Sequence, residues 1–277
     1  MKKFLVALCV CAAITGYSQK VSNALNFEKG RKLELTYKAN NTSASMGETK
    51  MDVTVVRSFD VNDVVNGNAT IEHKIKRIQF NLESMMGSEK FDSEKEADMK
   101  GDIGKALEKT LKNKYTMTVD ATGKITEVKE DKDKDKQPTP EDRMLLGMIE
   151  QVAGKIEAPA VGDFIEFRVL PVHEVGVGET WIDSVPGRTT NYTVKNISDN
   201  EILINFSESV NSEQKQEVNG MTVVITSADK TTGEIKIDRK SGLFREKTAN
   251  TTSEGSMSVM GQNMPMTSTS TKTWTLK

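Results

Sequence analysis

Hydrophobic and polar residues alternate with a period of two along most of the chain. The clearest runs are 33–38, 51–55, 115–119, 202–206 and 235–237. Such alternation places the apolar side chains of a strand on one face and the polar side chains on the other. Short turn sequences containing Gly, such as Asn66-Gly67 and Asn219-Gly220, separate the runs. We therefore expect successive hairpins and an antiparallel sheet with one buried face.

Between Ala69 and Leu82 the apolar positions change phase. Ile71 and Ile75 occupy odd positions, whereas Ile78 and Phe80 occupy even ones. One extra residue in a strand produces such a switch, because a β-bulge leaves that residue unpaired and increases the local twist. The pattern predicts a bulge near Lys76 and a strongly curved sheet.

Two segments have helical spacing instead. Residues 103–111 carry an apolar stripe, and residues 139–154 carry another, with Thr139 as N-cap and Pro140 at the first helical position. The run 129–136 alternates Lys with Asp or Glu and is typical of a solvated loop.

The expected fold class is mainly β: a curved antiparallel sheet or incomplete barrel in two similar halves, with two short helices. Residues 19–130 form the first half, 131–157 a charged linker and helix, and 158–277 the second half. The segments 117–125 and 235–244 share a strand, an Asp, a Ser/Thr-Gly turn and a return strand. This echo indicates either a duplication or two independent hairpins.

Residues 1–18 have the features of a signal peptide. Lys2 and Lys3 precede a short apolar run, and small residues stand before the expected cleavage after Ser18. Cys9 and Cys11, the two cysteines of the sequence, both lie in this leader. We expect an exported protein of the periplasm or the extracellular space, without disulfides.

Composition and charge limit the classes of binding partner that we expect. The formal net charge is −2, and no basic stripe with interleaved aromatic residues occurs, which argues against nucleic-acid binding. No apolar run after the leader has the length of a transmembrane helix, so no integral membrane span is expected after cleavage.

Three phrases carry a resemblance to known families: Leu170-Pro171, the stretch Val175–Trp181, and the stretch Ile237–Phe244. Together they resemble a family of uncharacterised exported Gram-negative envelope proteins. The Asp-x-x-Ser-Gly hairpin is also similar to one in periplasmic lipoprotein carriers, whose fold is an incomplete barrel around a helix. The resemblance implies a half-barrel fold and supplies no catalytic residues.

Candidates for catalysis are few. His73 and His173 are the two histidines, and neither stands in a spacing that suits a triad or a zinc site. No pair among the acidic residues is singled out for general acid–base work. We therefore predict a protein that is not an enzyme and needs no metal or other cofactor.

Methionine offers the more informative pattern. Several methionines stand at expected hairpin tips or in the C-terminal hairpin, and the candidate ligand-binding set is Met257, Met260, Met264, Met266, Met46 and Met86. Flexible thioethers at one rim would form an adaptable apolar mouth for a lipid or peptide. They could instead bind Cu(I). The third interpretation, packing between strands, is the simplest.

The sequence thus favours a non-catalytic exported envelope protein that binds or carries an apolar ligand such as a lipid. The alternative is a structural or protein-interaction module of the cell envelope. A further short motif, Asp183-Ser184-Val185, resembles an O-glycosylation acceptor, although the same three residues also suit an ordinary strand surface.

Overall fold

The computed structural model describes residues 19–45, 47–85, 87–130, 147, 149–150, 158–218, 221–259 and 262–277. The expected leader lies outside the described residues, as do residues 131–136 of the charged run and most of the expected helix at 139–154.

The described chain is dominated by long antiparallel strands. In chain order they are β1 (Lys20–Val21), β2 (Lys32–Ala44), β3 (Glu48–Val65), β4 (Asn68–Ser84), β5 (Gly87–Asp92), β6 (Lys114–Val119), β7 (Ile125–Glu130), β8 (Val175–Gly176), β9 (Thr180–Val185), β10 (Arg188–Ile197), β11 (Glu201–Val218), β12 (Met221–Asp238), β13 (Phe244–Val259) and β14 (Gln262–Leu276). Two helices lie among them, α1 (Glu96–Lys100) and α2 (Asp102–Lys112).

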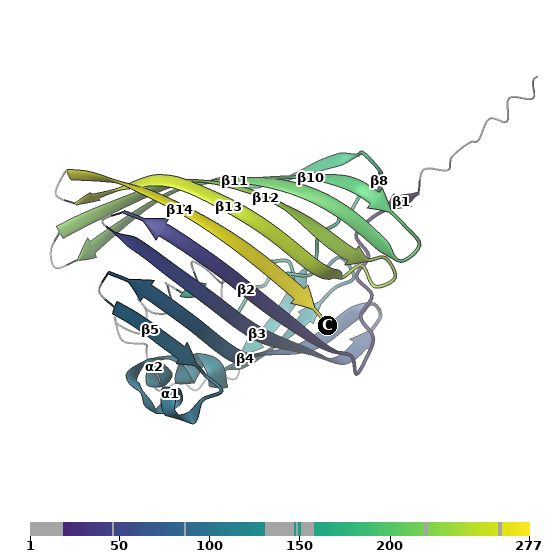
Figure 1. Ribbon diagram of the computed structural model, residues 1–277. Helices are drawn as coiled ribbons and strands as arrows, with labels where there is room; N and C mark the ends of the chain where they lie inside the picture. Colours follow the sequence, from purple (N-terminus) through teal and green to yellow (C-terminus); the bar gives the residue numbers. More distant parts are fainter. Residues whose placement is uncertain are drawn as a thin grey trace, which may run out of the picture.

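Twelve strands form one curved, open sheet (Figure 1). The order is β7-β6-β4-β3-β2-β14-β13-β12-β11-β10-β9, with β5 added beside β4. The pairing of β14 with β2 joins strands from both halves of the sequence into this sheet. The predicted fold class, a curved antiparallel sheet with two short helices, is confirmed.

The predicted change of phase in β4 is also confirmed. Val56 of β3 pairs with Arg77, whereas the next residue, Arg57, pairs with Ile75. Lys76 is the extra residue between them. It keeps both Ile75 and Ile78 on the buried face of the strand.

The helices pack against β4 and β5 in the first half of the chain. The stripe predicted at residues 103–111 lies in α2, whose Leu107 is fully buried against the cluster that contains Phe80 and Phe91. A bidentate ion pair between Arg77 of β4 and Asp92 of β5 joins the two strands. Arg77 Nε and Nη2 donate to the two Asp92 carboxylate oxygens at 3.0 and 2.7 Å. Both helices therefore sit at the β4–β5 end of the sheet (Figure 1).

Two irregular segments, 22–28 and 158–171, fill one end of the curved sheet, which we call the base. Leu25 and Phe27 from the first segment and Ile165 and Phe167 from the second join the main core cluster. That cluster also contains buried side chains of β6 and β7 at one edge of the sheet and of β9 to β11 at the other. The two segments therefore replace the strand pairing that a closed barrel would have at this end.

The β6–β7 and β12–β13 hairpins, which contain the similar segments 117–125 and 235–244, both form hydrogen bonds with segment 22–28. Asn23 Nδ2 donates to the Thr122 carbonyl of the β6–β7 turn at 2.6 Å, and the Asn26 amide donates to the Ser241 carbonyl of the β12–β13 turn at 2.8 Å. In each turn an Asp carboxylate accepts backbone amides: Asp120 from Thr122 and Lys124, and Asp238 from Ser241. The predicted turn chemistry is confirmed at both places.

Gly242 should tolerate substitution by alanine less well than Gly30, although both have a left-handed backbone conformation. Gly242 has φ of 71°, and a Cβ there would run into the Ala24 carbonyl. We expect Gly242→Ala to lower the free energy of unfolding by about 2–4 kcal/mol, from backbone strain plus displacement of segment 22–28. Gly30→Ala is the matched control, because Gly30 has φ of 81° with open space around it. Equal losses in urea denaturation would contradict the close approach.

His73 lies in the aromatic part of the core. It is 4% exposed, stacks on Tyr115 with ring centroids 4.4 Å apart, and contacts Phe59 at 4.7 Å. Burial, together with the nearby Arg57 guanidinium, lowers the pKa of His73 to about 3. The imidazole is therefore a neutral core residue at neutral pH.

His73 should make the fold sensitive to acid. Below about pH 6.5 the unfolded chain takes up a proton that the folded chain refuses, so the free energy of unfolding falls by about 1.4 kcal/mol per pH unit until about pH 3. His73→Phe should flatten this slope, whereas the control His173→Gln, at an exposed position, should not. Denaturation curves between pH 7 and pH 4 measure both, and an unchanged slope in His73→Phe would refute the assignment.

Candidate ligand-binding face

The inner face of the curved sheet is the surface that carries Phe206 of β11 and Trp274 of β14, both of which pack against the core. Along β11 to β14 this face changes character from the base to the strand tips. It begins with buried apolar residues, continues as a band of hydroxyl groups and ends in an apolar rim.

The base zone is closed. Ile204, Phe206 and Ile235 are buried there, in the core cluster that also contains Ile165 and Phe167 of segment 158–171. A side chain at Gly233 would meet the Phe206 ring and the Thr248 carbonyl, so the ring lies directly over that glycine. This zone has no room for a ligand.

The polar band lies next to it, and its hydroxyl groups are largely hydrogen-bonded to one another. Thr231 pairs with Thr251 at 2.8 Å, and Ser212 with Ser227 at 2.8 Å. Ser253 donates to Asp229 at 2.5 Å. On β14 the band continues through Ser268 and Ser270, and most of its members are half-buried.

Two lysines stand where the base meets the polar band. Lys247 of β13 lies directly opposite Trp274 of β14, and Lys272 lies opposite Ala249. The Lys247 ammonium lies over two aromatic rings, 4.7 Å from the centroid of Phe206 and 5.0 Å from that of Trp274. Burial lowers the pKa of both lysines, and the carboxylates of Glu208, for both, and of Asp229, for Lys272, partly oppose this effect. For Lys247, Arg188 and Lys272 lower the pKa further.

Three of the predicted methionines meet at the apolar rim. Met257 of β13 pairs with Met264 of β14, and Met266 pairs with Gly255, so all three share the inner face and are half-buried. Ile225 of β12 lies opposite Met257 and extends the rim. Met46, Met86 and Met260 lie outside the described residues. Both the ligand-mouth and the strand-packing interpretations fit this position, and each stays a prediction.

The pattern of the sequence did not lead us to predict the lysine pair, although the position of Lys272 could have been predicted from alternation. Lys272 has the same parity as Trp274 and Leu276, which puts a charge on an apolar face. The inward position of Lys247 could not be predicted from alternation, because a bulge at Arg245 shifts the phase of the strand. Ile237 pairs with Phe244, but Lys236 pairs with Glu246. Simple alternation from Phe244 would have placed Lys247 on the outer face.

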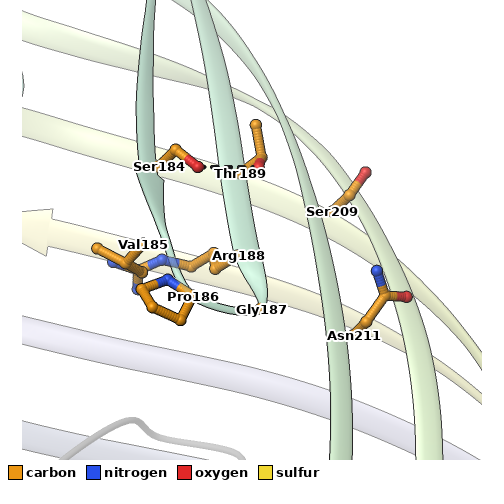
Figure 2. Close-up of a pocket in the computed structure, with 8 residues that line it drawn as sticks. All are labelled: Ser184, Val185, Pro186, Gly187, Arg188, Thr189, Ser209 and Asn211. Atoms are coloured by element: carbon orange, nitrogen blue, oxygen red, sulfur yellow. Dashed lines mark hydrogen bonds between the residues drawn. The ribbon is translucent and has the colours of Figure 1, made fainter.

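A separate shallow hollow of about 500 Å³ lies on the β9–β10 hairpin (Figure 2). Ser184 lines it and shares a hydrogen bond of 3.2 Å with Thr189 across the hairpin. Ser184 is exposed, as an acceptor for a sugar has to be, and its modification stays a prediction.

Within the part of the chain that the structure describes, the His, Cys, Asp and Glu side chains form no group of three that could hold a metal ion. Of the helices that the structure describes, none combines the length and the apolar character needed to cross a membrane.

Comparison with solved structures gives distant likenesses. A structure reporting lipid–protein interactions in lipovitellin matches 91% of this chain at 12% identity, with a TM-score of 0.45. The match spans a quarter (25%) of the lipovitellin chain. An outer-membrane channel from Pseudomonas putida F1 matches 92% of this chain and 98% of its own at 9% identity, with a TM-score of 0.28. At these values neither likeness bears on function.

Comparison of the sequence is more decisive. No curated protein matches it. A family described as being of unknown function, DUF6263, matches residues 66–244, from the β3–β4 turn to the first residue of β13. The match covers more than half of the chain, and the prediction of a family without assigned function is confirmed: the chain belongs to the DUF6263 family.

Proposed function

We propose that this chain is an exported, non-catalytic protein that binds an apolar ligand on the inner face of β11 to β14. One observation carries the proposal: beyond the base, the inner face is half-exposed and ends in an apolar rim. Soluble parts of proteins rarely leave grouped apolar side chains open to water unless they bind something.

The placement of the covering elements supports this site. The helices α1 and α2 pack on each other and on β4 and β5, and segment 158–171 packs at the base. The tips of β12, β13 and β14 extend beyond both (Figure 1). A ligand lying along these strands would contact Ile225, Met257 and Met264 from one side.

The polar band does not oppose an apolar ligand. An unpaired hydroxyl group covered by hydrocarbon costs about 1–3 kcal/mol, because it loses its hydrogen bonds to water. In the band, Thr231 and Thr251 bond to each other, as do Ser212 and Ser227. Covering these pairs leaves each hydroxyl with a partner, so the penalty is small.

Export and lack of catalysis rest on other features. The leader at residues 1–18, with its basic start and apolar run, supports export. The state of His73, neutral and enclosed by aromatic rings, supports a structural role for that residue instead of one in proton transfer.

A protein-interaction module is the second candidate, and the edge strand β9 favours it. β9 ends the strand order of the sheet, and on it Ile182 is 66% exposed and Val185 45% exposed. An open edge with apolar side chains can accept a strand from another protein.

The two candidates separate in one experiment. The protein purified from its native envelope is examined by native mass spectrometry and by solvent extraction followed by lipid analysis. We expect a bound apolar molecule of defined mass. A ligand-free protein that co-purifies with one stoichiometric protein partner would instead support the interaction module and refute our proposal.

Met266→Glu should weaken binding of a neutral apolar fluorophore such as N-phenyl-1-naphthylamine by about 10-fold or more, because it places a charge on the rim. Thr267→Glu is the control, since Thr267 follows directly on the same strand but is exposed on the outer face. Fluorescence titration measures both variants. Equal weakening in the two, or none in Met266→Glu, would place the fluorophore elsewhere.

A further inference from the structure

We infer that the ligand is an amphiphile with an acyl chain and an anionic head group, and that Lys247 and Lys272 receive the head group. This inference rests on the proposed function and adds the chemical class of the ligand. It is carried by the position of the two ammonium groups, by the lack of an ion pair at either of them within the described part of the chain, and by the surface that leads from them to the rim.

The two lysines are neighbours on one face. Lys247 lies opposite Trp274, and Lys272 stands two residues before Trp274 on the same strand. In an antiparallel pair such diagonal positions have Cβ atoms up to about 7–8 Å apart, within reach of two long side chains. One carboxylate or phosphate group can therefore contact both ammonium groups.

Neither lysine forms an ion pair with a carboxylate within 4.0 Å among the residues that the structure describes. Glu208 on β11 and Asp229 on β12, the acids whose charge acts on the lysines, have other hydrogen-bond partners. Glu208 accepts a hydrogen bond from Thr190 Oγ1 at 2.8 Å, and Asp229 accepts one from Ser253. Two half-buried positive charges are thus left facing the same space.

The surroundings hold the ammonium groups in place without neutralising them. The Phe206 and Trp274 rings fix Lys247 by cation–π contacts, which orient a cation and leave its charge intact. Lys272 is flanked by Ala249 on β13 and Ala39 on β2, so no large side chain stands directly beside it in either neighbouring strand. Burial lowers the pKa of both lysines, and a bound anion would oppose that effect.

The distance from the lysines to the rim suits an acyl chain. Lys272 and Met266 are six residues apart on β14, which is about 20 Å along a strand. One acyl chain spans about 15 Å, half of the hydrocarbon core of a bilayer. With its head group at Lys272, the chain would pass Ser270 and Ser268 of the polar band and end about 5 Å before Met266, which would border its tail.

The test compares ligands that differ in one part. Mature protein, stripped of bound molecules, is titrated with oleate, with oleyl alcohol as the uncharged chain, and with acetate and inorganic phosphate as head groups without a chain. In the double variant Lys247→Met, Lys272→Met we expect oleate affinity to fall by about 10-fold or more, since two charge-assisted contacts are lost. Its affinity for oleyl alcohol should be unchanged.

Lys38→Met combined with Lys230→Met is the matched control, because both lysines are exposed on the outer face, on β2 and β12, the strands that flank β14 and β13. It should bind oleate as the unmodified protein does. Folding gives an independent readout: removal of two repelling, half-buried charges should raise the Tm of the Lys247, Lys272 variant by about 2–4 °C. A variant that loses stability instead would show that the lysines serve the fold, which overturns the inference.

The remaining outcomes separate the inference from the proposed function. If oleate and oleyl alcohol bind the unmodified protein equally, the head-group assignment fails and the apolar site stands. If phosphate alone competes with oleate at equal concentration, the lysines form a free-anion site and the assignment of an amphiphile fails. If neither oleate nor oleyl alcohol binds, the proposed function fails, and the inference fails with it.

Discussion

The filling of one end of the sheet by irregular chain is the constraint on which the rest of the structure depends. A curved sheet that does not close leaves two edges and an apolar inner face, and that face has to be buried to stabilise the fold. Here Leu25 and Phe167 come from segments 22–28 and 158–171, and both reach the core between the edges. Arg57 strengthens this link through its ion pair with Glu166 at 3.3 Å. Ile149 is buried in the same way against Tyr37 and Ala39, so covering chain also reaches the inner face of the first half. The inner face of the described tips of β12 to β14 is half-exposed.

Bulges decide which side chains face that open end. The extra residue Lys76 keeps the apolar side chains of β4 on the buried face, although their parity in the sequence changes. The bulge at Arg245 has the opposite kind of effect, since it turns Lys247 inward beside Phe206. One geometrical device therefore preserves the core in the first half of the sheet and places a charge against it in the second.

Much of the fold could be predicted from local pattern. The alternation of β2 and β3, the helical spacing of α2 and the turns in which Asp120 and Asp238 accept backbone amides each depend on residues close together in the sequence. The hydrogen bonds of these two turns with segment 22–28 could not be predicted, because they join Asn23 and Asn26 to positions about 100 and 215 residues away. The methionine rim was visible as composition, whereas the lysine pair requires the register between β13 and β14, which no single strand reveals.

The placement of charge and hydroxyl groups explains how an open inner face can persist without a covering strand. A wholly apolar face would drive the two halves of the sheet together or recruit a second chain, because exposed apolar area is costly in water. Hydroxyl pairs such as Thr231 with Thr251 keep the middle of the face compatible both with water and with hydrocarbon. Lys247 and Lys272 resist collapse more strongly, since closing the sheet over two unneutralised ammonium groups would require their full desolvation. In the proposed complex, the anionic head group would neutralise the same two charges that oppose closure of the sheet.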